Sequence, residues 1–493
     1  MDAALAAELI RRHLFAQPAS HGLRDRLYLA LRQAILGAEL APGTVVPPSR
    51  LLALELDAGR STVVRVYERL IAEGYLAGAT GSGTRVSDAL PRSGTPSRPG
   101  ARTPDTPVRL SRRGARIDAL AASSPLQGGA FAPGVPDVAH FPFALWRRLV
   151  ARHTRYEERQ MAQYGFGGYG PLKLALAEYL RVTRMMSVQP QQVLILNGSH
   201  QAIDLCARML CDEGDRVWME DPGYWGARTV LSACGLQIDP VPVDQDGLAP
   251  PDDAGPRAPR LVFVSPSSQY PTGVVLSLER RLRLLEQVRR IGAWIIEDDY
   301  DNELRQEPHS LGSLFGLDGS RRVLYVGTFS KVMYPGLRLA YLVVPENLVV
   351  PFARGNADLY REGRLFEQAA MAEFIDGGHF TRHLRRMRGI YAERRETLRE
   401  AVAARLGGLA VTHGGQAGLQ LLYRFTQPVD DVSLASRALR DGVVLRPLSM
   451  YYLDAARRTS GLNLGFAAVP VDRIESAMTL VARALDSELG RPR

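Results

Sequence analysis

A lysine, Lys331, stands within the stretch Tyr325-Val-Gly-Thr-Phe-Ser-Lys-Val-Met-Tyr-Pro-Gly-Leu-Arg-Leu-Ala-Tyr341. Apolar runs at residues 323–326 and 339–344 border it, so Lys331 is expected in a tight turn between two buried strands. A desolvated lysine loses its proton and can attack a carbonyl to form a Schiff base. Lys331 is therefore a candidate covalent anchor, although a lysine that reaches out of a strand end into water explains the same pattern.

Lysine is rare in this chain. Of the 61 basic residues only Lys173 and Lys331 are lysines, so arginine serves wherever a simple cation is needed. Arginine stays protonated, whereas a lysine amine can become a nucleophile. The choice of lysine at position 331 therefore indicates chemistry rather than charge.

The composition sets limits on the class of protein. With 493 residues, 46% of them hydrophobic, the chain can form two or three domains with a large core. The net charge of +9 is uneven, because residues 1–128 hold 17 arginines against 11 acids. This excess indicates contact with a polyanion or a solvated basic linker. The three cysteines show no metal spacing, and no run approaches a membrane span, which predicts buried thiols and a cytoplasmic location.

The N-terminal residues predict a winged helix-turn-helix. Helical spacing of apolar residues occurs at 23–35, 51–56 and 63–71, and Ser49 is expected to cap the second helix. The third helix begins with exposed polar and basic residues, and the glycine-rich residues 75–86 predict a small hairpin. A helix fits the major groove of DNA with its N-terminal side chains toward the bases. A small helical interaction domain is the alternative.

Four short motifs support the DNA-binding interpretation. They are Val46-Pro-Pro-Ser-Arg50, Gly59-Arg-Ser-Thr-Val63, Glu73-Gly-Tyr75 and Gly81-Ser-Gly-Thr-Arg-Val86. Together they resemble the GntR family of bacterial regulators. The resemblance implies that DNA is contacted by Arg50, Arg60, Ser61, Thr62 and Arg65 and, on the wing, by Thr84 and Arg85.

Three regions are expected along the chain. Residues 1–86 form the DNA-binding domain, and residues 87–128, rich in Pro, Ser, Gly, Thr and Arg, form a flexible linker that spans roughly 35 Å as a coil. In residues 129–493 the strand-like runs 192–196, 216–219, 260–264, 294–296 and 323–326 alternate with helical patterns. This order predicts an α/β fold with a mostly parallel sheet. Later runs at 419–423, 443–446 and 462–467 predict a smaller C-terminal α/β lobe.

Chemically informative residues follow the predicted strands, at the edge where open α/β sheets bind ligands. Asn197-Gly-Ser-His200 opens a helix and suits a phosphate, and Glu220-Asp-Pro-Gly-Tyr224 offers a ring to a planar ligand or to the core. Glu297-Asp-Asp-Tyr-Asp301 places four acids at the end of a buried strand, where carboxylates require a partner.

That partner can be a metal, a protonated heterocyclic nitrogen or an arginine. No histidine accompanies the acids before His309, which disfavours the metal. A phosphate site, a stacking ring, an acid for a pyridine nitrogen and a Schiff-base lysine together indicate pyridoxal 5'-phosphate, PLP.

From about residue 131 to 485 the chain resembles the fold-type I aminotransferases, and with its N-terminal domain it resembles the MocR/GabR-type regulators. The resemblance makes Lys331 the residue that forms the Schiff base with PLP. Asp298 would face the pyridine nitrogen, Tyr300 the ring hydroxyl and Tyr224 the ring face. The phosphate would be held by Ser199, His200, Thr328, Ser330 and Arg338.

Three positions depart from the aminotransferase pattern. Tyr270 stands where an asparagine usually precedes Pro-Thr-Gly, with Gln269 as a candidate replacement. Asn463 stands where aminotransferases carry the arginine that binds the substrate carboxylate, and an amide cannot replace its charge. Gly226 stands where some amino-acid-sensing relatives have a second arginine. Arg228 and Arg446 are the candidate substitutes.

Two functions compete. The resemblance implies a homodimeric, PLP-binding transcription regulator whose aminotransferase-like domain is not an enzyme, with partial transamination activity left open. Its effector would be PLP itself or an amine or amino-acid derivative, which would shift the placement of the winged helices on double-stranded DNA. The alternative is a working PLP-dependent aminotransferase with an accessory DNA-binding domain.

Overall fold

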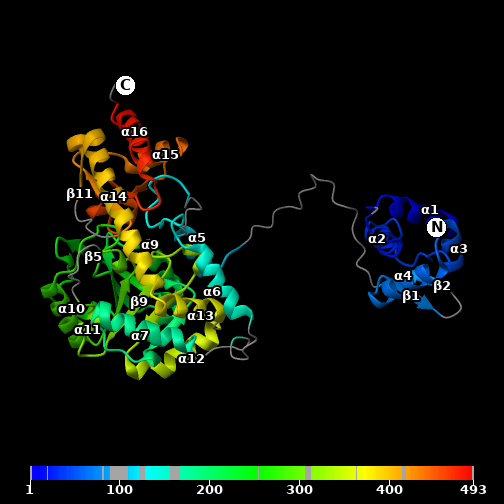
Figure 1. Cartoon of the computed structure of the whole chain (residues 1–493), viewed down its shortest axis with the longest axis horizontal. Coiled ribbons are helices and arrows are strands. Elements are labelled where there is room, and N and C mark those ends of the chain that lie inside the picture. The colour runs from blue at the N-terminus through cyan, green and yellow to red at the C-terminus, as the bar shows by residue number, and fades with distance from the viewer. Residues whose placement is uncertain are drawn as a thin grey trace. The chain divides into compact units, whose positions relative to one another are not determined.

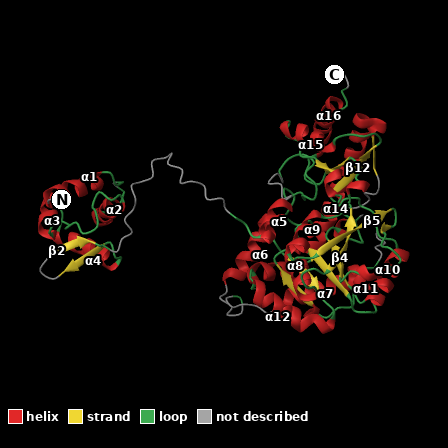
Figure 2. Ribbon diagram, turned by 180° about the vertical axis from the view of Figure 1, so that it is seen from behind, coloured by secondary structure: helices red, strands yellow, loops and turns green. Residues whose placement is uncertain are grey.

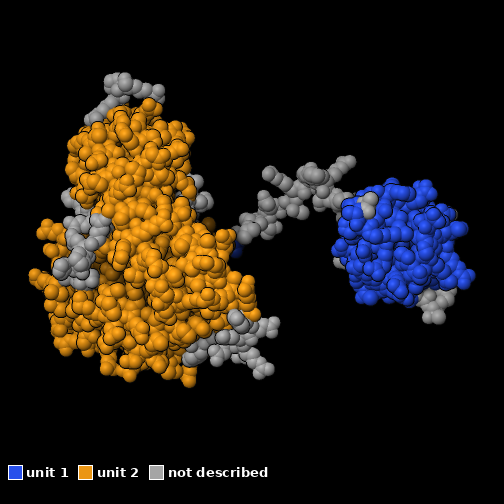
Figure 3. All heavy atoms as spheres, in the orientation of Figure 1, with its two compact units in different colours: residues 1–109 blue, residues 110–493 orange. Residues whose placement is uncertain are grey.

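The computed structural model describes residues 3–18, 20–79, 83–88, 109–120, 128–155, 161, 167–253, 255–305, 312–361, 363–412 and 418–490. The chain divides into two compact units, Met1–Arg109 and Leu110–Arg493 (Figure 3). Most of the predicted linker, residues 80–82 of the wing, and His309 lie outside the described residues. Among the described helices, none has the length and apolar character needed to cross a membrane.

The smaller unit is a helical bundle with a hairpin. Its core is formed by the apolar faces that the sequence pattern indicates, including Leu31, Leu52 and Val63. The hairpin strands pair in antiparallel register with Leu76 opposite Val86. The elements are α1 (Ala3–Phe15), α2 (Leu23–Leu36), α3 (Ser49–Glu55), α4 (Arg60–Ala72), β1 (Leu76–Ala79) and β2 (Gly83–Val86).

Two details of this unit differ from the sequence prediction. Helix α1 was not predicted, and it buries Ala6 and Ile10 against the same core. The predicted cap at Ser49 is wrong, because Pro48 provides the extended residue before α3 and no side chain caps the helix. Ser49 is already the first helical residue.

Helix α5 (Arg112–Leu120) lies within the stretch predicted to be linker. Its described side chains are largely exposed, and it contacts α9 (Trp225–Ala233) of the larger unit. Arg113 also approaches Glu213, with 3.7 Å between the guanidinium nitrogen and the carboxylate. Composition alone did not reveal this helix, because it has no buried apolar stripe to mark it.

The larger unit is built on an eight-stranded sheet with the order β3-β10-β9-β8-β7-β4-β5-β6. Strands β9, β8, β7, β4 and β5 are parallel, and β10 runs antiparallel to both β3 and β9. The strands are β3 (Val193–Leu196), β4 (Arg216–Asp221), β5 (Gln237–Asp244), β6 (Gly247–Leu248), β7 (Leu261–Val264), β8 (Trp294–Asp299), β9 (Val323–Thr328) and β10 (Ala340–Val343). The mostly parallel sheet agrees with the prediction.

Helices cover both faces of this sheet (Figure 2). Alternate residues along each strand point to opposite faces, so Leu194 joins the core with α8, α9 and α12, whereas Ile195 joins the core with α6, α7 and α13. Helices α10 and α11 complete the second face beside β7 and β8. The helices not yet given bounds are α6 (Phe143–Arg155), α7 (Gly170–Arg184), α8 (Ser199–Leu210), α10 (Leu278–Ile291), α11 (Leu314–Leu317), α12 (Val349–Tyr360) and α13 (Leu365–Asp376).

A smaller lobe follows the long helix α14 (His379–Leu406), which packs against α13 at one end and α16 in the lobe (Figure 1). The lobe is a four-stranded antiparallel sheet with the order β11-β12-β14-β13. Its elements are β11 (Ala410–Thr412), β12 (Gln420–Phe425), α15 (Asp431–Arg440), β13 (Arg446–Pro447), β14 (Gly461–Gly465) and α16 (Val471–Glu488). The predicted C-terminal lobe therefore exists, with β11 as an additional edge strand.

Candidate functional site

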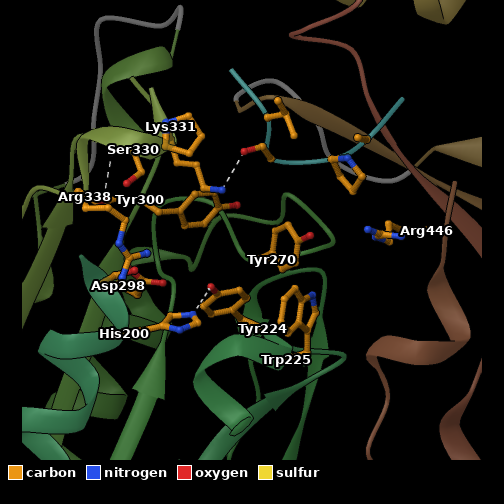
Figure 4. A pocket seen from close by; sticks show the side chains of 17 residues that line it. His200, Tyr224, Trp225, Tyr270, Asp298, Tyr300, Ser330, Lys331, Arg338 and Arg446 are labelled. Atoms are coloured by element: carbon orange, nitrogen blue, oxygen red, sulfur yellow. Dashed lines mark hydrogen bonds between the residues drawn. The ribbon is translucent and has the colours of Figure 1, made fainter. Parts of the chain in front are cut away.

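A cavity of about 330 Å³ lies where the strand ends of the large sheet meet the C-terminal lobe (Figure 4). It is lined by all nine side chains that the sequence predicts around PLP, namely Ser199, His200, Tyr224, Asp298, Tyr300, Thr328, Ser330, Lys331 and Arg338. Gly134, Trp225, Tyr270 and Arg446 also line it. Of these four, Gly134 and Trp225 carried no recognised signal in the sequence.

Lys331 reaches the cavity from the turn between β9 and β10, which pair through Thr328 and Ala340. Its Nζ donates a hydrogen bond of 2.8 Å to the carbonyl oxygen of Gly134, which lies far away in the sequence. A Cβ at position 134 would lie 3.0 Å from that Nζ. Desolvation lowers the pKa of Lys331, and the charges of Asp301 and Asp298 partly offset this effect. Lowering its pKa favours the neutral, nucleophilic amine.

The three acids of β8 differ in their surroundings. Neighbouring residues along a strand point to opposite faces, so Asp298 points away from the side on which Glu297 and Asp299 lie. Glu297 accepts hydrogen bonds of 2.9 Å from the backbone N–H groups that open α11. Asp299 pairs with Arg184 at 2.8 Å and accepts a bond from the Tyr325 hydroxyl at 2.5 Å. Of the three partners that the sequence leaves open for these acids, a metal, a heterocyclic nitrogen or an arginine, Asp299 has an arginine.

Asp298 faces the cavity instead. Its Oδ1 is buried and has no hydrogen-bond partner among the described residues. Desolvation and the charge of Asp299 raise its pKa to about 7, against the opposing effect of Lys331. A buried carboxylate without a partner is costly unless a ligand supplies a donor.

One end of the cavity suits a phosphate. Ser199 is the first residue of α8, whose free N–H groups favour an anion, and Arg338 lies beside Gly198. A Cβ at Gly198, which has φ of +114°, would lie 3.2 Å from the Arg338 guanidinium. The His200 ring hydrogen-bonds with the Tyr224 hydroxyl at 2.8 Å. Burial, together with Arg338 and Lys331, lowers the pKa of His200 and favours the neutral ring.

The wall of the cavity is aromatic. The Tyr270 ring meets the rings of Tyr224 and Tyr300 edge-on, with centroids 5.7 and 6.0 Å apart. Gln269 does not line the cavity, because its side chain is bonded to Thr272 in its own loop and to the Pro222 carbonyl in the segment after β4. The suggestion that Gln269 replaces the asparagine that usually precedes Pro-Thr-Gly is therefore wrong. Tyr270 itself occupies this part of the cavity wall.

The positions expected for carboxylate-binding arginines carry no charge. Asn463 is fully buried in β14 and donates a 3.2 Å hydrogen bond to the Tyr451 hydroxyl. At Gly226 a Cβ would lie 2.4 Å from the Tyr224 hydroxyl and 2.7 Å from His200 Nε2, so a side chain there would require these two rings to shift. Of the two suggested substitutes, Arg446 lines the cavity and Arg228 does not.

The predicted DNA-contacting residues share the smaller unit. Arg60, Ser61 and Arg65 are exposed at the start of α4, Thr62 is half-buried, and Arg50 is exposed in α3. In β2, Arg85 is exposed and Thr84 is half-buried. The Tyr67 hydroxyl donates a buried 2.7 Å hydrogen bond to the Pro47 carbonyl, which ties the segment before α3 to α4.

The residues of the cavity fit PLP. The unpartnered Oδ1 of Asp298 suits a protonated ring nitrogen, and the α8 N-terminus with Arg338 suits a phosphate. Lys331 supplies an amine for the aldehyde, between these two groups and the aromatic wall. The described residues contain no cluster of three or more metal-binding side chains.

Comparisons with known proteins assign a family to each of the two parts of the chain. Residues 136–481 match the family "Aminotransferase class I and II", and residues 23–86 match "Bacterial regulatory proteins, gntR family". The probable rhizopine catabolism regulatory protein MocR of Rhizobium meliloti is 41% identical over 91% of this chain and 90% of its own length. The regulator TauR of Rhodobacter capsulatus is 32% identical over 96% of this chain and 98% of its own.

Among solved structures, the α-aminoadipate aminotransferase LysN of Thermus thermophilus superposes with a TM-score of 0.69 and 29% identity. The superposition covers 77% of this chain and 98% of that protein, which was crystallised with a phosphopyridoxyl-leucine adduct. The matches to MocR and TauR span both units of the chain. The chain therefore belongs to the MocR-type transcription regulators, in which a gntR-family DNA-binding domain precedes a PLP-binding domain of aminotransferase class I and II.

Proposed function

We propose that this protein binds an operator through α4 and the β1–β2 wing as a homodimer in the cytoplasm, and that its PLP-loaded cavity senses a small amine. The observation that carries this proposal is the pairing of a complete cofactor cavity with an uncharged residue at position 463. Such a cavity can bind an amine at Lys331 without being arranged for turnover of ordinary α-amino acids.

Each side chain has a proposed task in holding the cofactor. Lys331 Nζ attaches it, Asp298 accepts a hydrogen bond from its ring nitrogen, and Tyr300 reaches its ring hydroxyl. Ser199, His200, Thr328, Ser330 and Arg338 hold its phosphate, and Tyr224 covers its ring. Bound PLP would supply an electrophilic carbon that reacts with primary amines and a ring that withdraws electrons.

The DNA contacts are proposed from exposure and chemistry. Arg50, Arg60 and Arg65 neutralise phosphates or reach bases, and Ser61, Thr62, Thr84 and Arg85 complete the contact with the backbone. A ligand in the larger unit changes operator binding only if its affinity differs between the DNA-bound and free arrangements of the dimer.

PLP itself is a second candidate effector. Asn463 removes the charge expected for an α-amino acid, and a relative of 29% identity is the pyridoxine biosynthesis regulator PdxR of Corynebacterium glutamicum. If PLP is the effector, its binding in the cavity would by itself change operator binding, without any added amine.

Turnover separates the proposed regulator from an aminotransferase. The PLP-loaded full chain should release no keto acid in steady state from a broad panel of amino acids with 2-oxoglutarate or pyruvate as acceptor. Continuous keto acid production at a rate of about 1 s⁻¹ or more, within the ordinary range of enzymes, would replace the regulator by an enzyme.

A further inference from the structure

Two helices of the larger unit carry basic residues that the proposed function does not use. Helix α6 contains four arginines and no acid. The first ten residues of α14, 379–388, contain four more arginines and again no acid. The rest of α14 is different, because its arginines alternate with Glu393, Glu396 and Glu400. Unbalanced positive charge is therefore concentrated in two helical segments.

These two segments lie side by side because both helices pack against α13 (Figure 1). The Phe374 ring of α13 meets the rings of Trp146 in α6 and His379 in α14, with centroids 5.9 and 5.8 Å apart. Phe141, just before α6, meets the His383 ring of α14 at 5.4 Å. These contacts bury the inner sides of both helices, and the exposed arginines lie on their outer sides.

We call the exposed arginines of these segments the α6–α14 face. It consists of Arg147, Arg148, Arg152, Arg382, Arg385 and Arg386. Arg152 pairs with Glu373, which also lies 3.0 Å from the His153 ring. Arg382 hydrogen-bonds with the His379 ring at 3.1 Å. The other four arginines of the face make no ion pair with any described residue.

The face lacks the acids that balance arginines on another exposed helix. On α10, Arg283 pairs with Asp252 and Arg289 with Glu286, each at 2.8 Å. The acids at the α14 end of α13 are only two, Glu373 and Asp376, against eight arginines in the two flanking segments.

The spacing of the arginines adds to this imbalance. Arg148 and Arg152 stand four residues apart on α6, and Arg382 and Arg386 stand four apart on α14. Like charges at this spacing repel each other and destabilise a helix. An anionic partner removes the repulsion, so the face suits a polyanion.

We propose that the α6–α14 face binds the phosphate backbone of double-stranded DNA, as a second contact that reads no sequence. DNA is the polyanion that the gntR-family domain already brings to this protein. A guanidinium group can hold a phosphate through two parallel hydrogen bonds. Phosphate contacts position a duplex without reading its bases. The face engages the backbone outside the operator and adds affinity without specificity, independently of any effector.

The test measures the salt dependence of DNA affinity by fluorescence anisotropy of the PLP-loaded full chain. Two labelled duplexes of about 60 base pairs are used, one of unrelated sequence and one from immediately upstream of the gene. Arg147→Gln/Arg148→Gln and Arg385→Gln/Arg386→Gln should each lower the slope of log affinity against log salt on both duplexes. The expected change is about 0.9 for each lost phosphate contact, so up to about 1.8 for each double variant.

Two further variants control for charge. Arg283→Gln/Arg289→Gln removes the same number of exposed arginines from α10 and should leave both slopes unchanged. Arg385→Lys/Arg386→Lys keeps the charge of the face and should retain most of the wild-type slope. The absorbance of bound PLP confirms that each variant is folded.

Unchanged slopes in both double variants, or an equal loss in the α10 control, overturn the DNA contact. A variant that alters the sedimentation of the protein but not the slopes assigns the face to contact between copies of the chain, which also overturns it. So does binding to phosphatidylglycerol vesicles that the variants lose while their slopes stay unchanged. Because the unrelated duplex needs no operator, its slopes test the face separately. Absence of specific binding to the upstream DNA contradicts the proposed function alone.

Discussion

Asp298 shows at the residue scale how a single carboxylate is reserved for a ligand. Glu297 accepts bonds from α11 and Asp299 pairs with Arg184 through its Oδ2. The Oδ1 atoms of Asp298 and Asp299 both lack a partner among the described residues, and of these two acids Asp298 lines the cavity. Its pKa of about 7, above the ordinary value because of burial and Asp299, means that ionising it in the ligand-free fold costs stability. The loss of stability begins as the pH rises above the pKa that Asp298 has in the unfolded chain. It grows until about pH 7 and persists at higher pH.

Asp298→Asn should therefore separate stability from cofactor affinity. At pH 8 the PLP-free variant is expected to be at least as stable as the wild type, since it removes a buried charge that has no partner. Its PLP affinity should fall by roughly 10- to 100-fold, because a charge-assisted hydrogen bond is lost. Thermal unfolding and equilibrium dialysis measure the two quantities. A marked loss of stability with unchanged affinity would show that Asp298 is a structural residue.

The lowered pKa of Lys331 predicts a pH dependence of cofactor attachment. Only the neutral amine attacks the PLP aldehyde, so the rate should rise with pH and level off above the pKa of this lysine. Desolvation places that pKa below the ordinary value of 10.5. Because the Asp298 charge raises it, Asp298→Asn should move the profile to lower pH.

The rate is followed by stopped-flow absorbance on PLP-free protein between about pH 7 and 10, at constant ionic strength. Lys331→Ala serves as the control and should develop no protein-bound absorbance band. A wild-type rate that still rises in proportion to hydroxide concentration at pH 10 would contradict the lowered pKa.

At the scale of elements, side-chain contacts hold the C-terminal half of α4 in place, and the N-terminal half carries the exposed basic residues. The Arg69 guanidinium lies 3.7 Å from the centre of the Tyr28 ring and 2.9 Å from the Glu73 carboxylate, and Tyr67 bonds to Pro47. Arg60 in the first turn and Arg65 in the second, by contrast, are exposed. Fixing one half of a helix orients the other half for a groove.

Tyr67→Phe tests this anchoring. The substitution leaves the Pro47 carbonyl without its buried donor and should destabilise the smaller unit by about 1 kcal/mol. Because Pro47 leads into α3, operator affinity should fall as well. Chemical denaturation measures the first effect and anisotropy of labelled DNA the second. Tyr75→Phe, which alters a hydroxyl bonded to Arg32 nearer the surface, is the control and should have the smaller effect on both.

Arg60→Ala and Arg65→Ala should weaken operator binding and reduce its salt dependence. Each lost phosphate contact is expected to lower the slope of log affinity against log salt by about 0.9, and a base contact costs about 1–3 kcal/mol at one position of the site. Arg289→Ala, which removes one exposed charge from α10 in the larger unit, is the matched control. Equal slopes for all three variants would place the DNA contact elsewhere.

The elements also show what the sequence could reveal. Strands β4, β7, β8 and β9 fall within or next to the predicted runs because their buried apolar residues are continuous. Helix α5 and strand β11 lack such a signal, since their side chains are mostly exposed and they depend on contacts with other elements. The cavity residues that follow strand ends were predictable because the apolar runs show where those strands end.

Gly134 and Trp225 were not predictable from motifs. Gly134 reaches Lys331 across 197 positions of sequence, a pairing that only the folded chain reveals. Arg446 could be suspected but not placed, because its position depends on the register between two strands of two and five residues. Distances along a sequence carry little information about such pairs.

At the scale of the whole molecule, each unit has its own core. The smaller unit is closed around one hydrophobic cluster, and the cofactor cavity is lined entirely by residues between Ala132 and Arg446 of the larger unit. Coupling between the two requires that the cofactor-loaded and cofactor-free proteins present their winged helices differently to DNA.

The central claim is tested most directly by fluorescence anisotropy of DNA from immediately upstream of the gene. The labelled DNA is titrated with PLP-free protein, PLP-loaded protein and PLP-loaded protein with an amine panel, all at one stated salt concentration. We predict tight, sequence-specific binding whose affinity changes by at least fivefold with PLP or with one amine, the lower end of ordinary allosteric coupling. In Lys331→Ala this response should be lost while DNA binding remains. Specific binding that no ligand alters, or the absence of specific binding in every form, would contradict the account.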